Sequence, residues 1–175
     1  MFVRKKLNHG QHYAYLVRSS WVAGKGPRQK VGKYLGKVVK PERTGTELFK
    51  MNEETLAKAQ FKEMATALLL HELKQHGFGE KEGMLVGGDI AVDSGFRVTR
   101  KGRPAVLELN NGFLSEETIQ YLLNYSAEKD PKGEELARRL VGAGVAASEE
   151  AFIALFEKAR PATKEEEALP EDFYY

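Results

Sequence analysis

The chain has 175 residues, of which 42% are hydrophobic and 30% charged, and its formal net charge at pH 7 is +2. A chain of this size can bury one hydrophobic core and a small satellite domain. The absence of cysteine excludes a disulfide framework and a thiolate metal site, and agrees with a reducing compartment. No apolar stretch follows the charged start and no long apolar run occurs elsewhere, so we expect neither a signal peptide nor a membrane span, and a cytoplasmic location.

Charge is unevenly distributed along the sequence. The first forty residues hold ten of the 27 Lys and Arg and none of the 25 Asp and Glu, which leaves 17 basic and 25 acidic residues in positions 41–175. A segment without internal counter-charge repels itself unless an external polyanion neutralises it, and nucleic acid is the abundant cellular polyanion. The distribution therefore predicts a nucleic-acid-binding region over residues 1–40, called the head below.

Alternation of apolar and polar residues with period two marks the head. It predicts strands over residues 2–7, 12–22 and 28–39, separated by turns at residues 8–10 and 24–27. Strict alternation on the third strand places Arg28, Lys30 and Tyr34 on one face. The predicted object is a three-stranded antiparallel sheet that needs a cover on one face, and we expect a helix from the rest of the chain to supply it.

Helical periodicity governs much of residues 46–160, called the body, which follow a linker at residues 41–45. We predict a long helix from an N-cap at Asn52 to about His76, a hairpin near residues 96–109, and three helices opened by Ser115, Asp130-Pro131 and Ser148. The acidic tail, residues 161–175, is expected to be disordered. The predicted fold class is thus α+β: a small N-terminal three-stranded antiparallel sheet, a long helix, and a mostly helical body with one β-hairpin.

Several short motifs of the head occur in the same order in a known family. They are Arg4-Lys5-Lys6, Tyr13-Ala14-Tyr15-Leu16-Val17, a glycine turn, Pro27-Arg28-Gln29-Lys30 and Tyr34-Leu35-Gly36. In these motifs the head resembles the basic β-region that precedes the catalytic domain in DDE-type insertion-sequence transposases. The resemblance covers about residues 1–40 and implies DNA binding at or near the ends of an element. The remaining residues are too few for the ribonuclease-H-like domain of that family.

The predicted nucleic-acid-binding residues are ten side chains of the head: Arg4, Lys5, Lys6, Arg18, Lys25, Arg28, Lys30, Lys33, Tyr34 and Lys37. An antiparallel ribbon can enter the major groove of DNA and present such cations from one face. The aromatic residues Tyr13, Tyr15, Trp21 and Tyr34 could instead stack on unpaired bases, as in binders of single strands or RNA loops. Alternatively, they could form the core of the small sheet.

Candidates for catalysis and metal binding are few. Asp89, Asp93 and Glu108 flank predicted strands and could bind Mg²⁺ if they converge. However, Asp93-Ser94-Gly95 is typical of a turn, and His71 and His76 lie five apart on a helix, too far around it to share a metal. We therefore predict no catalytic residue, no metal site and no cofactor.

The sequence predicts a non-enzymatic nucleic-acid-binding protein with no membrane partner. DNA is favoured over RNA because of the transposase-like head. The alternatives are an RNA- or ribosome-associated accessory protein, a diverged transposase or nuclease fragment, and a protein-interaction module. The target sequence and the oligomeric state stay open.

Overall fold

Nine strands form one mixed sheet in the computed structural model, which describes residues 1–24, 26–50 and 57–160. The strand order is β1-β2-β3-β8-β7-β6-β5-β4, and β9 pairs with β8. Neighbouring strands are antiparallel except β3 and β8, which are parallel. The strands are β1 (Phe2–Asn8), β2 (Gln11–Val22), β3 (Gly26–Val39), β4 (Gly79–Lys81), β5 (Met84–Gly87), β6 (Ile90–Val92), β7 (Val98–Arg100), β8 (Arg103–Leu109) and β9 (Gly112–Leu114).

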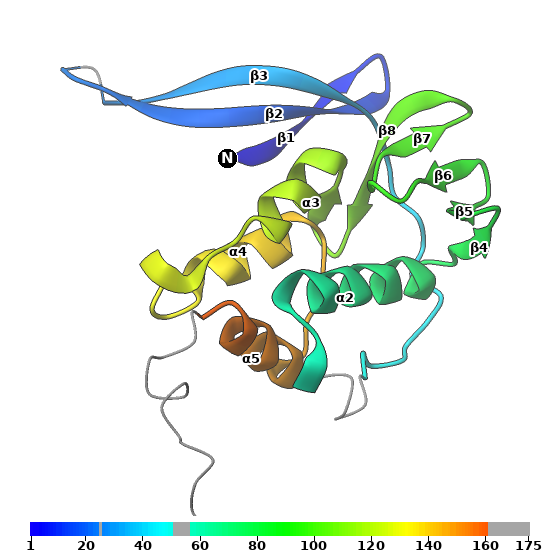
Figure 1. The fold of residues 1–175 in the computed structure, drawn as a ribbon. Coiled ribbons are helices and arrows are strands. Elements are labelled where there is room, and N and C mark those ends of the chain that lie inside the picture. The colour runs from blue at the N-terminus through cyan, green and yellow to red at the C-terminus, as the bar shows by residue number, and fades with distance from the viewer. Residues whose placement is uncertain (25, 51–56, 161–175) are drawn as a thin grey trace, which may run out of the picture.

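The head forms the three antiparallel strands that alternation predicts. β1 pairs with β2 in unbroken register from Phe2 opposite Val17 to Asn8 opposite Gln11, and β2 pairs with β3. His9 and Gly10 make the first turn with positive φ values of 46° and 73°. Figure 1 shows β2 and β3 extending together well past the end of β1.

The predicted fold class was wrong for the body and for the extent of the sheet. The body supplies six strands, and among the described residues 36% lie in strands against 31% in helices. The head sheet is also not separate, because β3 pairs with β8. Strands β4 to β7 have only three or four residues each, too few for alternation to be recognised, since pairing with neighbours rather than local pattern stabilises them.

Four α-helices and one 3₁₀ turn complete the described chain: α2 (Phe61–Gln75), α3 (Glu116–Leu123), η1 (Ala127–Lys129), α4 (Glu134–Gly142) and α5 (Glu149–Lys158). Ser115 and Ser148 cap α3 and α5 as predicted. The long helix ends before Gly77 as predicted, but α2 begins only at Phe61; the predicted cap Asn52 and the tail lie outside the described residues. None of the described helices combines the length and apolar character needed to cross a bilayer.

The helices pack on the body strands, while a smaller core forms under the head. The larger core joins residues of all four α-helices, such as Leu68, Leu136 and Leu155, to strands β5 to β9. The smaller core consists of Ala14, Leu16, Leu35 and Val106, with Val3, Val38 and Phe113 packed against it. The buried partners of the head sheet therefore come from β8 and β9, not from the helix that the sequence predicted.

Head and body meet at Gly36, where β3 passes close to β8. Gly36 is buried and has a φ of 141°, and a Cβ built there would lie 2.6 Å from the carbonyl oxygen of Pro104 and 2.7 Å from the nitrogen of Ala105. Only glycine combines this backbone conformation with so close an approach. The motif Tyr34-Leu35-Gly36 thus has a structural reason: it allows β3 to join β8.

Replacement of Gly36 should destabilise the contact between the head and the body. Gly36→Ala should lower the free energy of unfolding by about 2 kcal/mol or more, because of the unfavourable φ and the backbone clash. Urea denaturation followed by circular dichroism measures the change. Gly32→Ala is the matched control on the same strand, since its Cβ would make only a 3.5 Å contact; an equal loss in both variants would contradict the junction role.

Candidate nucleic-acid interface

The end of β2 and the beginning of β3 form a two-stranded ribbon, residues 18–22 and 26–30, called the arm below (Figure 1). Arg18 lies directly opposite Lys30, and Ser20 lies opposite Arg28, so three cations project from one face. Like charges directly opposite each other destabilise a strand pair. Among the described residues none of these three cations has an ion-pair partner. The arm thus presents an unneutralised basic face.

Two bulges in β3 change which side chains share a face. Val17 lies opposite Val31, Tyr15 opposite Tyr34, and Ala14 opposite Gly36, so β3 has an extra residue in each interval. Each extra residue reverses the alternation. Tyr34 consequently lies on the face of Tyr15, opposite to the face of Arg28 and Lys30, and the predicted common face of these three residues is wrong.

The head sheet has an outer face, opposite the smaller core. It carries Arg4, Lys6, Tyr13, Tyr15, Tyr34 and Lys37. The ring of Tyr34 lies 5.5 Å from that of Tyr15 and 6.3 Å from that of Tyr13, and Lys6 Nζ lies 5.2 Å from the Tyr15 ring centre. These distances are typical of aromatic and cation–π contacts. Basic and aromatic groups therefore alternate on one exposed surface.

The aromatic residues of the head do not make its core. Tyr34 is 49% exposed and Trp21, on the arm, is 77% exposed, whereas Ala14, Leu16 and Leu35 are buried. Partial burial, together with the neighbouring Tyr13 and Tyr15, raises the pKa of Tyr34 above its usual value. Its ring is therefore neutral at physiological pH and does not repel an anionic ligand.

Two of the predicted binding cations instead hold the head on the body. Lys5 Nζ lies 2.7 Å from a carboxylate oxygen of Glu108 on β8, and Lys33 Nζ lies 2.6 Å from Glu117 on α3. The hydrogen bond to Glu117 raises the pKa of Lys33. Of the other predicted cations, Arg4 donates a hydrogen bond to Gln29, and Lys25 lies outside the described residues. Among the described binding candidates, the cations that have no ion pair with the body are Arg18, Arg28 and Lys30 on the arm, and Arg4, Lys6 and Lys37 elsewhere on the head.

The three carboxylates considered for Mg²⁺ do not form a common site. Glu108 binds Lys5, Asp93 accepts hydrogen bonds from the backbone of its own turn at 2.9 Å, and Asp89 pairs with Arg100 at 2.9 Å. The hydrogen bond from Arg100 lowers the pKa of Asp89. In residues 1–24, 26–50 and 57–160, no three His, Asp or Glu side chains are grouped in a way that could hold a metal ion.

The sequence-based prediction missed a second basic cluster, in the hairpin of β7 and β8. Arg100, Lys101 and Arg103 lie beside Tyr34 and Lys37 of the head and line an open groove with them. The signal is present as three cations within four residues, but the local pattern of this segment predicts only a turn. Its place beside the head depends on the pairing of β3 with β8.

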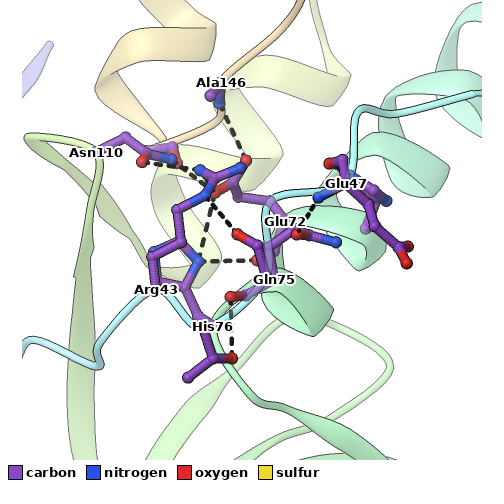
Figure 2. A network of polar contacts seen from close by, with 11 residues as sticks. Arg43, Glu47, Glu72, Gln75, His76, Asn110 and Ala146 are labelled. Carbon is purple, nitrogen blue, oxygen red and sulfur yellow. Dashed lines mark hydrogen bonds and ion pairs between the residues drawn. The ribbon is translucent and has the colours of Figure 1, made fainter.

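A buried polar network ties the linker to the body (Figure 2). Glu72 on α2 is 1% exposed and accepts hydrogen bonds from Arg43 at 2.9 Å and from Asn110 at 2.7 Å. Its second oxygen accepts a bond from the backbone of Ala146 at 3.4 Å, and His76 Nδ1 lies 3.3 Å from the first. The partners come from the linker, the β8–β9 turn and the segment before α5, so one carboxylate joins segments distant in sequence.

Comparison with known proteins places the chain in no family. No family model matches it, no curated protein matches it, and no solved structure matches it.

Proposed function

We propose that this protein binds nucleic acid through the head, with the arm as its main contact. The observation that carries the proposal is the pairing of Arg18 with Lys30 directly across two strands, next to Arg28 and without an acidic partner among the described residues. Such an arrangement costs free energy in the unbound protein. Phosphate groups of a bound polyanion would offset the repulsion between Arg18 and Lys30 and would attract both side chains.

Duplex DNA is the ligand that the shape of the arm favours. A two-stranded β-ribbon fits the major groove of B-DNA, whereas the major groove of A-form RNA is too deep and narrow for it. The resemblance of the head to the basic β-region of DDE-type transposases also supports DNA.

A second candidate is RNA binding, as an accessory protein of RNA or the ribosome. The exposed ring of Tyr34 favours it, because unpaired bases of RNA stack on such rings. A cytoplasmic location fits both candidates, and the absence of cysteine agrees with it.

Salt dependence tests the proposal. If about five cations of the head contact phosphates, the logarithm of the binding constant for duplex DNA should fall with the logarithm of salt concentration with a slope of roughly −4 to −5. Fluorescence anisotropy of a labelled duplex at several salt concentrations gives this slope. Structured RNA of equal length is the comparison. Tighter binding to RNA than to DNA at every salt concentration would favour the second candidate. A binding constant that does not change with salt concentration would refute both candidates.

A further inference from the structure

The groove between the head and the β7–β8 hairpin has the features of a binding site. It has a volume of about 690 Å³ and is lined by Tyr13, Tyr34, Lys37, Arg100, Lys101, Arg103 and Pro104. Pockets of about 300–1,000 Å³ are usual for small ligands. One wall comes from the outer face of the head and the other from the hairpin, and the close passage of β3 by β8 at Gly36 sets their separation.

The groove is strongly basic. Four cations line it, and Asp89, which pairs with Arg100 at 2.9 Å and approaches Lys101 at 3.8 Å, offsets only part of their charge. Arg103 lies directly opposite Arg100 in the hairpin, and no described residue forms an ion pair with Arg103. Asp89 neutralises Arg100 of this opposed pair, so Arg103 is the cation that a bound anion would stabilise.

An aromatic surface lies next to these cations. Tyr34 is 49% exposed and its partners Tyr13 and Tyr15 hold the ring in place from one side. The faces of base pairs inside a duplex are covered by their neighbours, whereas an unpaired base can stack on such a ring. Phosphate-binding cations beside a stacking ring are the combination that binds single-stranded nucleic acid.

We propose that this groove binds an unpaired nucleotide, with its phosphate at Arg103 and Lys37 and its base on Tyr34. The inference rests on the proposed function, because the arm would hold the adjoining duplex. Lys30 and Lys37 are seven residues apart on β3, or roughly 20 Å along the strand, and their side chains lie on opposite faces of it. A molecule that contacts both arm and groove must therefore pass from one face of the ribbon to the other, which a flexible single strand leaving the duplex can do. The preferred ligand is then DNA in which a duplex continues into a single strand.

The experiment compares a blunt duplex of roughly 20 base pairs with the same duplex carrying a short single-stranded thymidine extension at the 3′ or the 5′ end. The full-length protein should bind one of the extended duplexes about tenfold more tightly than the blunt one. Arg103→Gln should abolish this preference and leave affinity for the blunt duplex unchanged. Tyr34→Leu should abolish the preference as well. Tyr34→Phe, which keeps the ring, should retain it.

The controls separate this inference from the proposed function. Arg138→Gln removes an exposed cation on α4 that does not line the groove, and it should leave the preference intact. Circular dichroism checks that each variant is folded. Equal affinity for blunt and extended duplexes in the unmodified protein overturns the groove site alone. Full preference for the extended duplex in a folded Arg103→Gln variant overturns it as well. Failure to bind any duplex would instead overturn the proposed function.

Discussion

Neutralisation of the arm by the triple substitution Arg18→Gln, Arg28→Gln and Lys30→Gln should weaken binding to duplex DNA by roughly 10²- to 10³-fold near 0.1 M salt. The salt slope should become shallower by about 3, because three phosphate contacts and their released counterions are lost. The same change should leave the protein equally or slightly more stable, since it removes the repulsion of Arg18 and Lys30. Anisotropy titrations and urea denaturation measure the two effects, and their opposite signs distinguish loss of contacts from loss of folding.

The matched control removes three cations elsewhere. Lys62 and Lys74 on α2 and Lys132 before α4 are exposed, and their replacement by Gln changes the net charge equally. This control should reduce affinity far less, because the charges lie away from the arm. Equal losses in the two triple variants would show that net charge alone, rather than the arm, governs binding.

Removal of the buried carboxylate by Glu72→Ala should lower the free energy of unfolding by about 3 kcal/mol or more. The substitution removes one acceptor each from Arg43 and Asn110, which keep their bonds to the carbonyl groups of Gly45 and Gly144, and it removes the partner of the Ala146 N–H, beside a side chain that is 1% exposed. Urea denaturation gives the change, and the slope of the transition shows whether unfolding remains cooperative.

Two further variants make this test specific. Glu80→Ala removes an exposed carboxylate of β4 and should change stability by less than about 0.5 kcal/mol. Arg43→Met, combined with Glu72→Ala in a double-mutant cycle, should show a coupling energy of about 1 kcal/mol or more. A loss for Glu72→Ala no larger than that for Glu80→Ala would mean that the linker is held by other contacts, such as the backbone bonds of Thr44 and Gly45 to Gln75.

The sequence pattern of an element was sufficient to predict it where the pattern lies entirely within that element's own residues. The three head strands follow from alternation, the ends of α3 and α5 follow from the caps Ser115 and Ser148, and the concentration of charge in the head follows from counting. A helix cap satisfies a backbone N–H within its own turn, and a long alternating strand shows its two faces in its own residues, so both can be recognised without the rest of the chain.

Contacts between residues distant in sequence determined the strands, bulges and ion pairs that the sequence did not predict. The short strands β4 to β7 exist because they pair with neighbours, and the bulges that move Tyr34 to the other face arise from the fit of β3 to β2. The partners of Lys5 and Lys33 lie on β8 and α3, and no sequence pattern links residues so far apart.

The concentration of basic residues in the head was therefore determined by the sequence itself, and it predicts nucleic acid as their partner. Only the tertiary structure decided which of these cations are neutralised by the body and which are left exposed. It also placed Arg100, Lys101 and Arg103 beside Tyr34 and Lys37. The physical reason is the parallel pairing of β3 with β8 past Gly36, a contact between segments about seventy residues apart that neither segment specifies alone.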